Sequence, residues 1–148
     1  QGNQWHPGML KFANRLFPKI GITEKAEELV RTLAPAAQEA GGDIVIGSLD
    51  EISRAGVLVN TTSVGMNSDD LPLPANILRR NIVVLDAVYS PMETALLKAA
   101  KRAGDQTVDG LWMLIQQARR QCAHQFGWNP DAEPMREAAE RELAARHK

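Results

Sequence analysis

The sequence has little cysteine, no long apolar run and no block of like charge. Its single cysteine, Cys122, excludes an internal disulfide and a zinc site built on clustered cysteines. Cys122 falls on an apolar helical face, so we expect a small core residue rather than a nucleophile. No stretch approaches the roughly 18–20 apolar residues of a membrane span, the first residues do not resemble a signal peptide, and a net charge of -1 disfavours nucleic acid. These absences predict a cytoplasmic protein without a membrane or nucleic-acid partner.

The composition that is present suits one globular domain. Apolar residues make up 44% and charged residues 24% of the 148 residues, which is enough for a hydrophobic core. From residue 43 onward, short apolar runs alternate with helical patterns, which favours an α/β fold with a parallel sheet. Strands are expected at 19–22, 43–47, 56–60 and 81–86, and residues 106–109 are expected to form a brief strand or a link. Helices are expected at 9–17, 24–40, 49–52, 75–78, 93–103, 110–126 and 133–145.

The expected helices carry start and stop signals. Thr23 is a candidate N-cap, Pro35 is expected to kink or restart the helix that follows, and Gly41 with Gly42 should end it. The long helix that opens at Gly110 has an apolar stripe. Its members are Leu111, Leu114, Ile115, Ala118 and Cys122.

The stretch NTTSVGM at residues 60–66 directly follows an expected strand. In open α/β sheets, ligands bind beyond the carboxyl ends of the strands. Asn and Thr side chains there can hydrogen-bond a ligand or close the loop on itself, and Gly65 permits a left-handed backbone or a close backbone approach. A polar turn without a ligand explains the stretch about as well. The segment alone leaves both interpretations open.

Three segments together resemble the signatures of one enzyme family. NTTSVGM at 60–66 is similar to the Asn-Ala/Thr-Thr-x-x-Gly-Met signature of the shikimate dehydrogenases. DAVYSPMET at 86–94 resembles their Asp-x-Val-Tyr-x-Pro-x-x-Thr segment, and GLWMLIQQA at 110–118 resembles their Gly-Leu-x-Met-Leu-x-x-Gln-Ala helix. Trp128 to Met135 is similar to the family's ending. The resemblance covers about residues 41–135 and indicates the C-terminal, NADP-binding half of such an enzyme.

The resemblance implies a Rossmann-like parallel sheet with flanking helices, N-terminally truncated and followed by C-terminal helices. It implies NADPH-dependent reduction of 3-dehydroshikimate to shikimate, a step of aromatic amino acid biosynthesis, and hence an oxidoreductase with a small-molecule substrate. The residues it assigns to the cofactor are Asn60, Thr61 and Thr62 beyond the strand end, Ala87 and Gly110 where backbone approaches the nicotinamide, and Met113 near its ring. The residues it assigns to the substrate are Tyr89 and Gln117.

Each assigned role has a structural alternative. Met113 can be core filling, Tyr89 can be a buried tyrosine with a satisfied hydroxyl, and Gln117 can be simply exposed on its helix. Asp69 and Asp70 could bind a cation, but a solvated loop is favoured because no third carboxylate is nearby in the sequence. No metal site is predicted.

Two parts of the family pattern are absent from the sequence. The N-terminal substrate domain with its Lys and Asp catalytic pair is absent, so no catalytic residue is assigned and the isolated chain is expected to be inactive. Residues 1–22 lack the strand, Gly-x-Gly-x-x-Gly and helix that cradle a pyrophosphate. Residues 20–23 (IGIT) stand where the family has Asn-Arg-Thr, so NAD in place of NADP stays open.

The expected organisation is one partial domain over residues 1–148, with a diverged start at 1–22 and a C-terminal helix at 133–147. One alternative is a non-catalytic Rossmann-like remnant that binds a partner, such as a separate N-terminal domain or subunit, because a lost first strand would expose a sheet edge. Others are an NAD-dependent quinate/shikimate dehydrogenase and the end of a bifunctional dehydroquinate dehydratase fusion. The chain begins with Gln1 rather than Met. Its true start and its oligomeric state stay open.

Overall fold

The structure, a computed structural model, describes residues 22–47, 49–78 and 81–146. The helix predicted at 9–17 lies outside the described residues, and so does the strand predicted at 19–22 except for its last residue. Residues 1–22, where the family would place a Gly-rich phosphate loop, also lie outside the described residues except for residue 22.

The centre of the fold is a parallel sheet of three strands, β1 (Val57–Asn60), β2 (Val83–Asp86) and β3 (Gln106–Val108), in the order β1-β2-β3. Both neighbouring pairs are parallel, with Val59 of β1 opposite Leu85 of β2. Parallel strands need a crossover between them, and the intervening segments supply it. The predicted α/β fold with a parallel sheet is confirmed, with strand ends shifted by one or two residues.

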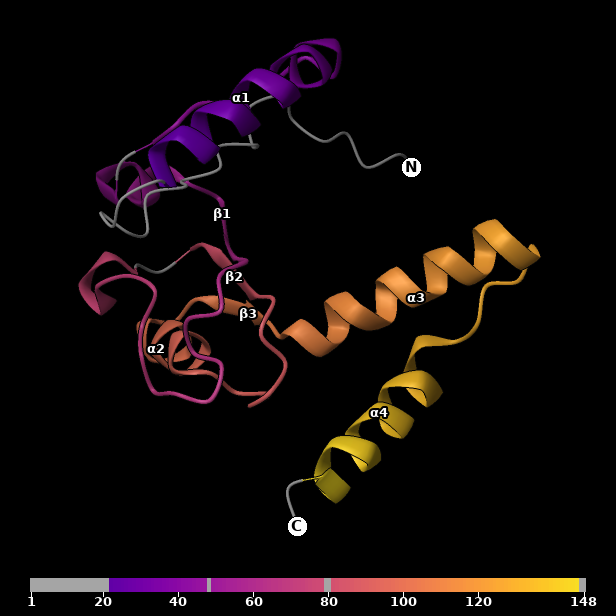
Figure 1. The fold of residues 1–148 in the computed structure, drawn as a ribbon. Coiled ribbons are helices and arrows are strands. Elements are labelled where there is room, and N and C mark those ends of the chain that lie inside the picture. The colour runs from indigo at the N-terminus through magenta and orange to yellow at the C-terminus, as the bar shows by residue number, and fades with distance from the viewer. Residues whose placement is uncertain (1–21, 48, 79–80, 147–148) are drawn as a thin grey trace.

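Helices flank this sheet and extend away from it (Figure 1). They are α1 (Ile22–Glu39), η1 (Leu49–Arg54), η2 (Ala75–Ile77), α2 (Ala95–Ala103), α3 (Gly110–Phe126) and α4 (Ala132–Arg146), where η denotes a 3-10 helix. α2 packs against β2 and β3, whereas α3 leaves the sheet and packs against α4. None of the helices in the described ranges is both long enough and apolar enough to cross a bilayer.

Capping residues set the ends of α2 and α3. The Thr94 hydroxyl accepts a hydrogen bond from the Leu97 amide, so α2 begins at 95 rather than at the predicted 93. Asp109 caps the start of α3 in the same way. Both helices end at a glycine in the left-handed conformation, Gly104 with φ 84° and Gly127 with φ 64°.

One predicted strand, 43–47, does not form. The segment has no regular structure and pairs with no strand in the described part of the chain, and Val45 and Ile46 are 46% and 41% exposed. A strand needs a neighbouring strand to satisfy its backbone groups. The apolar pattern within one segment does not reveal whether that neighbour is there.

Helix α1 also differs from its prediction. It begins at Ile22, so Thr23 lies inside the helix and is not its N-cap. It continues through Pro35, so the helix does not restart there, and alanines on both sides favour its continuation. The predicted end is confirmed, since the helix stops before Gly41, whose φ is 74°.

The hydrophobic core lies on one side of the sheet, which we call the closed face. Leu58 and Val84 point to this side, where α2 and the two 3-10 helices cover them. The cluster consists of Ile52, Leu58, Leu73, Leu78, Ile82, Val84, Leu96, Leu97, Ala99 and Ala100. Alternate residues point to the other side, the open face, where Val57 and Val59 are 39% and 38% exposed.

The apolar stripe predicted on α3 is right in part. Leu111 and Ile115 are buried, and Ala118 and Cys122 are half-buried. Leu114 is 42% exposed, so its place in the stripe is wrong. The physical reason is that α3 leaves the sheet after its first turns and has too few neighbours to cover a wide apolar face.

Candidate functional site

Strands β1 and β2 end on a buried polar pair, Asn60 and Asp86. The two residues are opposite each other in the parallel register and are 2% and 0% exposed. Asn60 Nδ2 donates a hydrogen bond of 2.9 Å to Asp86 Oδ1. Buried polar groups are stable only when they are bonded. The pair therefore fixes the two strand ends relative to each other.

The loop after β1 is closed by its own side chains. The backbone amide and the hydroxyl of Thr62 both donate to Asn60 Oδ1, at 3.1 and 2.8 Å. The Val64 amide then donates to Thr62 Oγ1 at 3.2 Å. The side chains of Asn60 and Thr62 therefore shape this loop from within. Thr61, the third residue assigned there, is exposed.

Asp86 joins three segments through one buried carboxylate. Its Oδ1 accepts from the Val88 amide at 3.1 Å as well as from Asn60, and its Oδ2 accepts from Thr94 Oγ1 at 2.6 Å. Thr94 is 1% exposed. No role was predicted for either residue, although Asp86 ends an apolar run and Thr94 belongs to the 86–94 segment. Both position loops.

Gly110 is required by close backbone packing. A Cβ placed at this glycine would lie 2.4 Å from the Ala87 carbonyl oxygen and 2.7 Å from the Val88 carbonyl oxygen. Real Cβ atoms do not come so near to other atoms, so only glycine lets the start of α3 touch the loop after β2. The structure brings Ala87 and Gly110 together at this contact. The backbone that approaches Gly110 belongs to the protein itself.

A second polar contact ties α4 to the start of α3. Arg136 of α4 donates through two nitrogens to the two carboxylate oxygens of Asp109, at 2.9 Å each, and its Nε donates to Glu140 at 2.7 Å. The same guanidinium lies over the Trp112 ring, 4.7 Å from its centroid. We call these four residues the Arg136 latch. The cap signal of Asp109 was visible in the sequence, but its partner 27 residues away was not.

The latch shifts the acid-base properties of its members. Burial raises the pKa of Asp109, but the Arg136 hydrogen bonds and the backbone amides of α3 outweigh it, and the pKa lies below its ordinary value. Hydrogen bonding to Asp109 raises the pKa of Arg136, with Glu140 acting in the same direction. Both groups are therefore held in their charged forms.

An open groove runs along α3 on the open face of the sheet. Its volume is about 770 Å³, and its lining is mainly apolar. Met113 and Gln117, two of the assigned residues, lie in it together. The lining residues are Leu85, Val108, Trp112, Met113, Gln116, Gln117, Arg120 and Gln121. The flat apolar end with Trp112 and Met113 suits an aromatic ring, and the glutamines offer neutral hydrogen bonds to a polar ligand.

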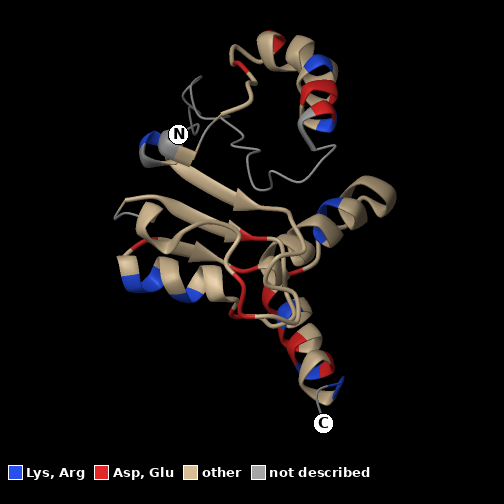
Figure 2. Ribbon diagram, turned by 60° about the vertical axis from the view of Figure 1, so that its left-hand side comes forward, with Lys and Arg blue, Asp and Glu red and all other residues tan. Residues whose placement is uncertain are grey.

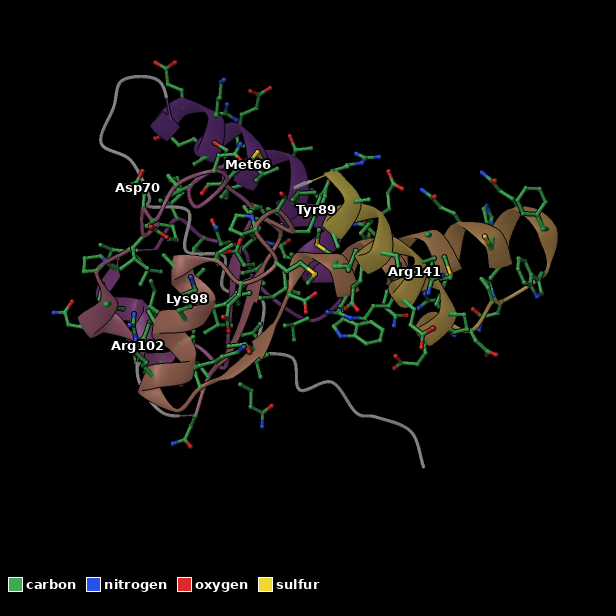
Figure 3. All side chains as sticks on the ribbon, turned by 90° about the horizontal axis from the view of Figure 1, so that it is seen from below. Met66, Asp70, Tyr89, Lys98, Arg102 and Arg141 are labelled. Carbon is green, nitrogen blue, oxygen red and sulfur yellow. The ribbon has the colours of Figure 1, made fainter. Side chains whose placement is uncertain are left out.

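Tyr89 lies outside the lining of this groove. It sits on the loop after β2, is 42% exposed, and is labelled there in Figure 3, apart from Lys98 and Arg102 on α2. The structural alternative, a buried tyrosine with a satisfied hydroxyl, therefore does not hold. The structure therefore groups Met113 with Gln117 and groups Ala87 with Gly110, while Thr61 and Tyr89 stand at the surface.

Charged residues are unevenly distributed around these features. Figure 2 shows acidic residues near the carboxyl ends of the strands and basic residues along α2. Asp69 and Asp70 are exposed on their loop. Within the described ranges, no three His, Cys, Asp or Glu side chains gather closely enough to hold a metal ion.

A parallel sheet with polar loops at its strand ends and helices around it defines the class, a Rossmann-like α/β domain.

No protein-family model matches the chain. The chain is 52% identical over 85 residues to the shikimate dehydrogenase (NADP(+)) of Thermococcus kodakarensis, covering 57% of this chain and 31% of the relative. It is 40% identical over 141 residues to that of Azorhizobium caulinodans, covering 91% of this chain and 49% of the relative. The chain thus spans at most about half the length of these two relatives.

Solved structures agree with this similarity. The quinate dehydrogenase of Corynebacterium glutamicum in complex with NAD has a TM-score of 0.68 and 35% identity, covering 78% of this chain and 42% of that one. The shikimate 5-dehydrogenase of Thermus thermophilus in complex with NADP(H) and shikimate has a TM-score of 0.63 and 34% identity, covering 76% and 42%. The chain is thus similar in sequence and in structure to the C-terminal part of the shikimate dehydrogenases, the family that its three motifs resemble.

Proposed function

We propose that this chain is the cofactor-binding part of an NADP-dependent shikimate dehydrogenase, which reduces 3-dehydroshikimate to shikimate. The observation that carries the proposal is the α3 groove, because it unites Met113 and Gln117 beside the contact between Gly110 and Ala87. The names of the homologous enzymes support the same reaction. A cytoplasmic location accords with the single cysteine.

The residues present fit a nicotinamide ring. Trp112 and Met113 give the groove an apolar wall, and Leu85 and Val108 of the sheet give it an apolar floor. The chemistry that the cofactor supplies when bound is the transfer of a hydride to a ring ketone. The residues of this chain bind and orient: Met113 packs on the ring, and Gln117 hydrogen-bonds the substrate.

Asn60, Thr62 and Ala87 act on the cofactor indirectly in this proposal, because their groups hold the strand-end loops in place. The exposed side chains of Thr61 and Tyr89 are free to reach the cofactor and the substrate. We assign no catalytic acid or base to this chain. The purified 148-residue polypeptide is therefore expected to bind cofactor without turning over substrate.

The test is a titration with NADPH, followed by Trp112 emission in a background in which Trp5 and Trp128 are replaced by Phe. Trp112 lines the groove, so a bound ring should quench it. Met113→Ala should weaken binding several-fold because the ring loses its apolar contact. Leu114→Ala is the matched control, since Leu114 is the next residue, is exposed and lies outside the groove lining. Equal effects of the two variants, or no saturation by NADPH at millimolar concentration, would contradict the proposal.

An NAD-dependent quinate or shikimate dehydrogenase is a second candidate. The observation that favours it is the similarity to a quinate dehydrogenase in complex with NAD. The same titration with NADH decides between the two cofactors. Tighter binding of NADPH supports the first candidate, and tighter binding of NADH supports the second.

A partner-binding module without catalysis is a third candidate. The exposed Val57 and Val59 on the open face and the exposed Val45 and Ile46 favour it, because apolar surfaces of this kind promote association. Size-exclusion chromatography with light scattering tests it. A monomer that also binds NADPH argues against it.

A further inference from the structure

Helix α4 packs against α3, and the Arg136 latch joins the two helices. No residue of α4 in the described part is fully buried, and its apolar residues Met135, Ala139 and Leu143 are only half-buried. The Arg136 latch is better shielded, with the side chains of Arg136 and Asp109 15% and 22% exposed. A shielded bidentate pair has defined geometry, unlike an exposed one. The latch therefore sets where α4 lies.

The latch also reaches the wall of the groove. One carboxylate, that of Asp109, accepts the Trp112 backbone amide at 3.0 Å and both Arg136 bonds. The Arg136 guanidinium stacks on the Trp112 ring, and that ring lines the groove beside Met113. Backbone and ring of the same residue are thus held by one ion pair. The ring cannot change its tilt without breaking the stack.

We infer that Arg136 is a positioning residue for the ligand groove, which makes α4 part of the site although it supplies no lining residue. It holds the Trp112 ring as a fixed wall against which a planar ligand ring packs. This inference rests on the proposed function, because it takes a nicotinamide as the planar ring. Its physical basis is preorganisation. A Trp112 ring that is already fixed in the free protein loses no conformational entropy when the ligand binds.

The test compares four variants of the 148-residue chain, in the background that retains only Trp112. Arg136→Ala removes the hydrogen bonds to Asp109 and the contact with the Trp112 ring. Arg136→Lys keeps the positive charge but not the planar guanidinium that forms two parallel hydrogen bonds. Arg141→Ala is the matched control on the same helix, since its pair with Glu137 is 4.0 Å long and exposed. The measurements are the Kd for NADPH and the indole N–H signal of Trp112 in NMR spectra.

Arg136→Ala should weaken NADPH binding by about three- to tenfold and shift or broaden the indole signal. Arg136→Lys should recover part of both effects, and Arg141→Ala should change neither. Leu96→Ala controls for general destabilisation, because it weakens the closed-face core without touching the groove. It should keep the normal Kd at a temperature where the variant is folded.

Two outcomes overturn the inference. If Arg136→Ala leaves both the Kd and the indole signal unchanged while the parent chain binds NADPH, the inference fails and the proposed function stands. If Leu96→Ala weakens binding as much as Arg136→Ala, Arg136 acts only through stability and the inference also fails. If the parent chain binds no NADPH, the proposed function fails, and an unchanged indole signal in Arg136→Ala then rejects the positioning of Trp112 separately.

Discussion

The two faces of the sheet differ in how far the side chains of the same strands are buried. On the closed face, Val84 is 0% exposed and Leu58 is 7% exposed, under α2. On the open face, Val57 and Val59 stay exposed, and Leu85 lies in the floor of the groove. Neighbouring residues of one strand thus belong to a dry core and to an open groove. The difference separates residues needed for stability from residues available for binding, and the variants below test it.

The largest expected effect is on the closed face. Leu96→Ala removes a side chain that is 1% exposed in the core, which should lower the free energy of unfolding by about 2–5 kcal/mol. Leu85→Ala on the open face should cost less, because Leu85 is only half-buried, and should weaken NADPH binding instead. Urea denaturation of both variants measures the difference. Equal losses of stability would mean that the two faces are packed alike.

A smaller effect is expected where α3 meets the loop after β2. Gly110→Ala forces a methyl group to within 2.4 Å of the Ala87 carbonyl, so the two segments must separate. We expect a loss of about 1–3 kcal/mol together with weaker NADPH binding. Gly42→Ala is the control, since a Cβ there would make only an ordinary contact of 3.8 Å. If Gly110→Ala folds and binds as the parent does, the close packing is not needed for the groove.

Asp109 should make the stability of the latch depend on pH. Its folded pKa lies below the ordinary value of 3.8, so its contribution is present above about pH 3.8 and is lost as pH falls through the folded pKa. Asp109→Asn removes that contribution and should cost about 1 kcal/mol at neutral pH. Denaturation at a series of pH values should show the gap between parent and variant narrowing in acid. A gap independent of pH down to 2 would refute the assignment.

The smallest effect is expected at the exposed end of α4. Arg146 and Glu142 form a pair of 3.0 Å, but their side chains are 70% and 63% exposed. Arg146→Ala should therefore change the free energy of unfolding by at most about 0.5 kcal/mol. Its melting curve should overlay that of the parent, whereas Arg136→Ala should not. A large effect of Arg146→Ala would show that α4 depends on its surface charges more than on the latch.

The sequence predicted the sheet because its evidence is local. The continuous apolar runs at 57–59 and 83–85 are each followed by a polar residue, and such runs indicate strands on either face of a sheet. The same local evidence was insufficient at 43–47, where a strand-like run has no partner in the described part of the chain. Strand pairing depends on distant residues, and the run itself carries no information about them.

The candidate site was predictable only where local sequence motifs sufficed, as was the sheet. The motifs singled out Met113, Gln117, Ala87 and Gly110, which the structure brings together in two pairs. Their roles toward a cofactor and a substrate stay predictions. They did not reveal that the Asn60 side chain is bonded within the protein, since a loop amide looks the same whether it faces a ligand or a buried acid. The Arg136 latch was invisible, because it joins residues 27 positions apart on different elements.

Three donors from separate segments converge on the Asp86 carboxylate, and this has a consequence for hydrogen exchange. The Val88 amide is one of them, although it belongs to a loop. It can exchange with deuterium only when its hydrogen bond to the buried carboxylate breaks. We therefore expect it to exchange as slowly as the amides of the central strand. Tyr89, the next residue, is exposed on the same loop. A ligand that touches Tyr89 would therefore meet a loop that the buried Asp86 carboxylate already holds in place.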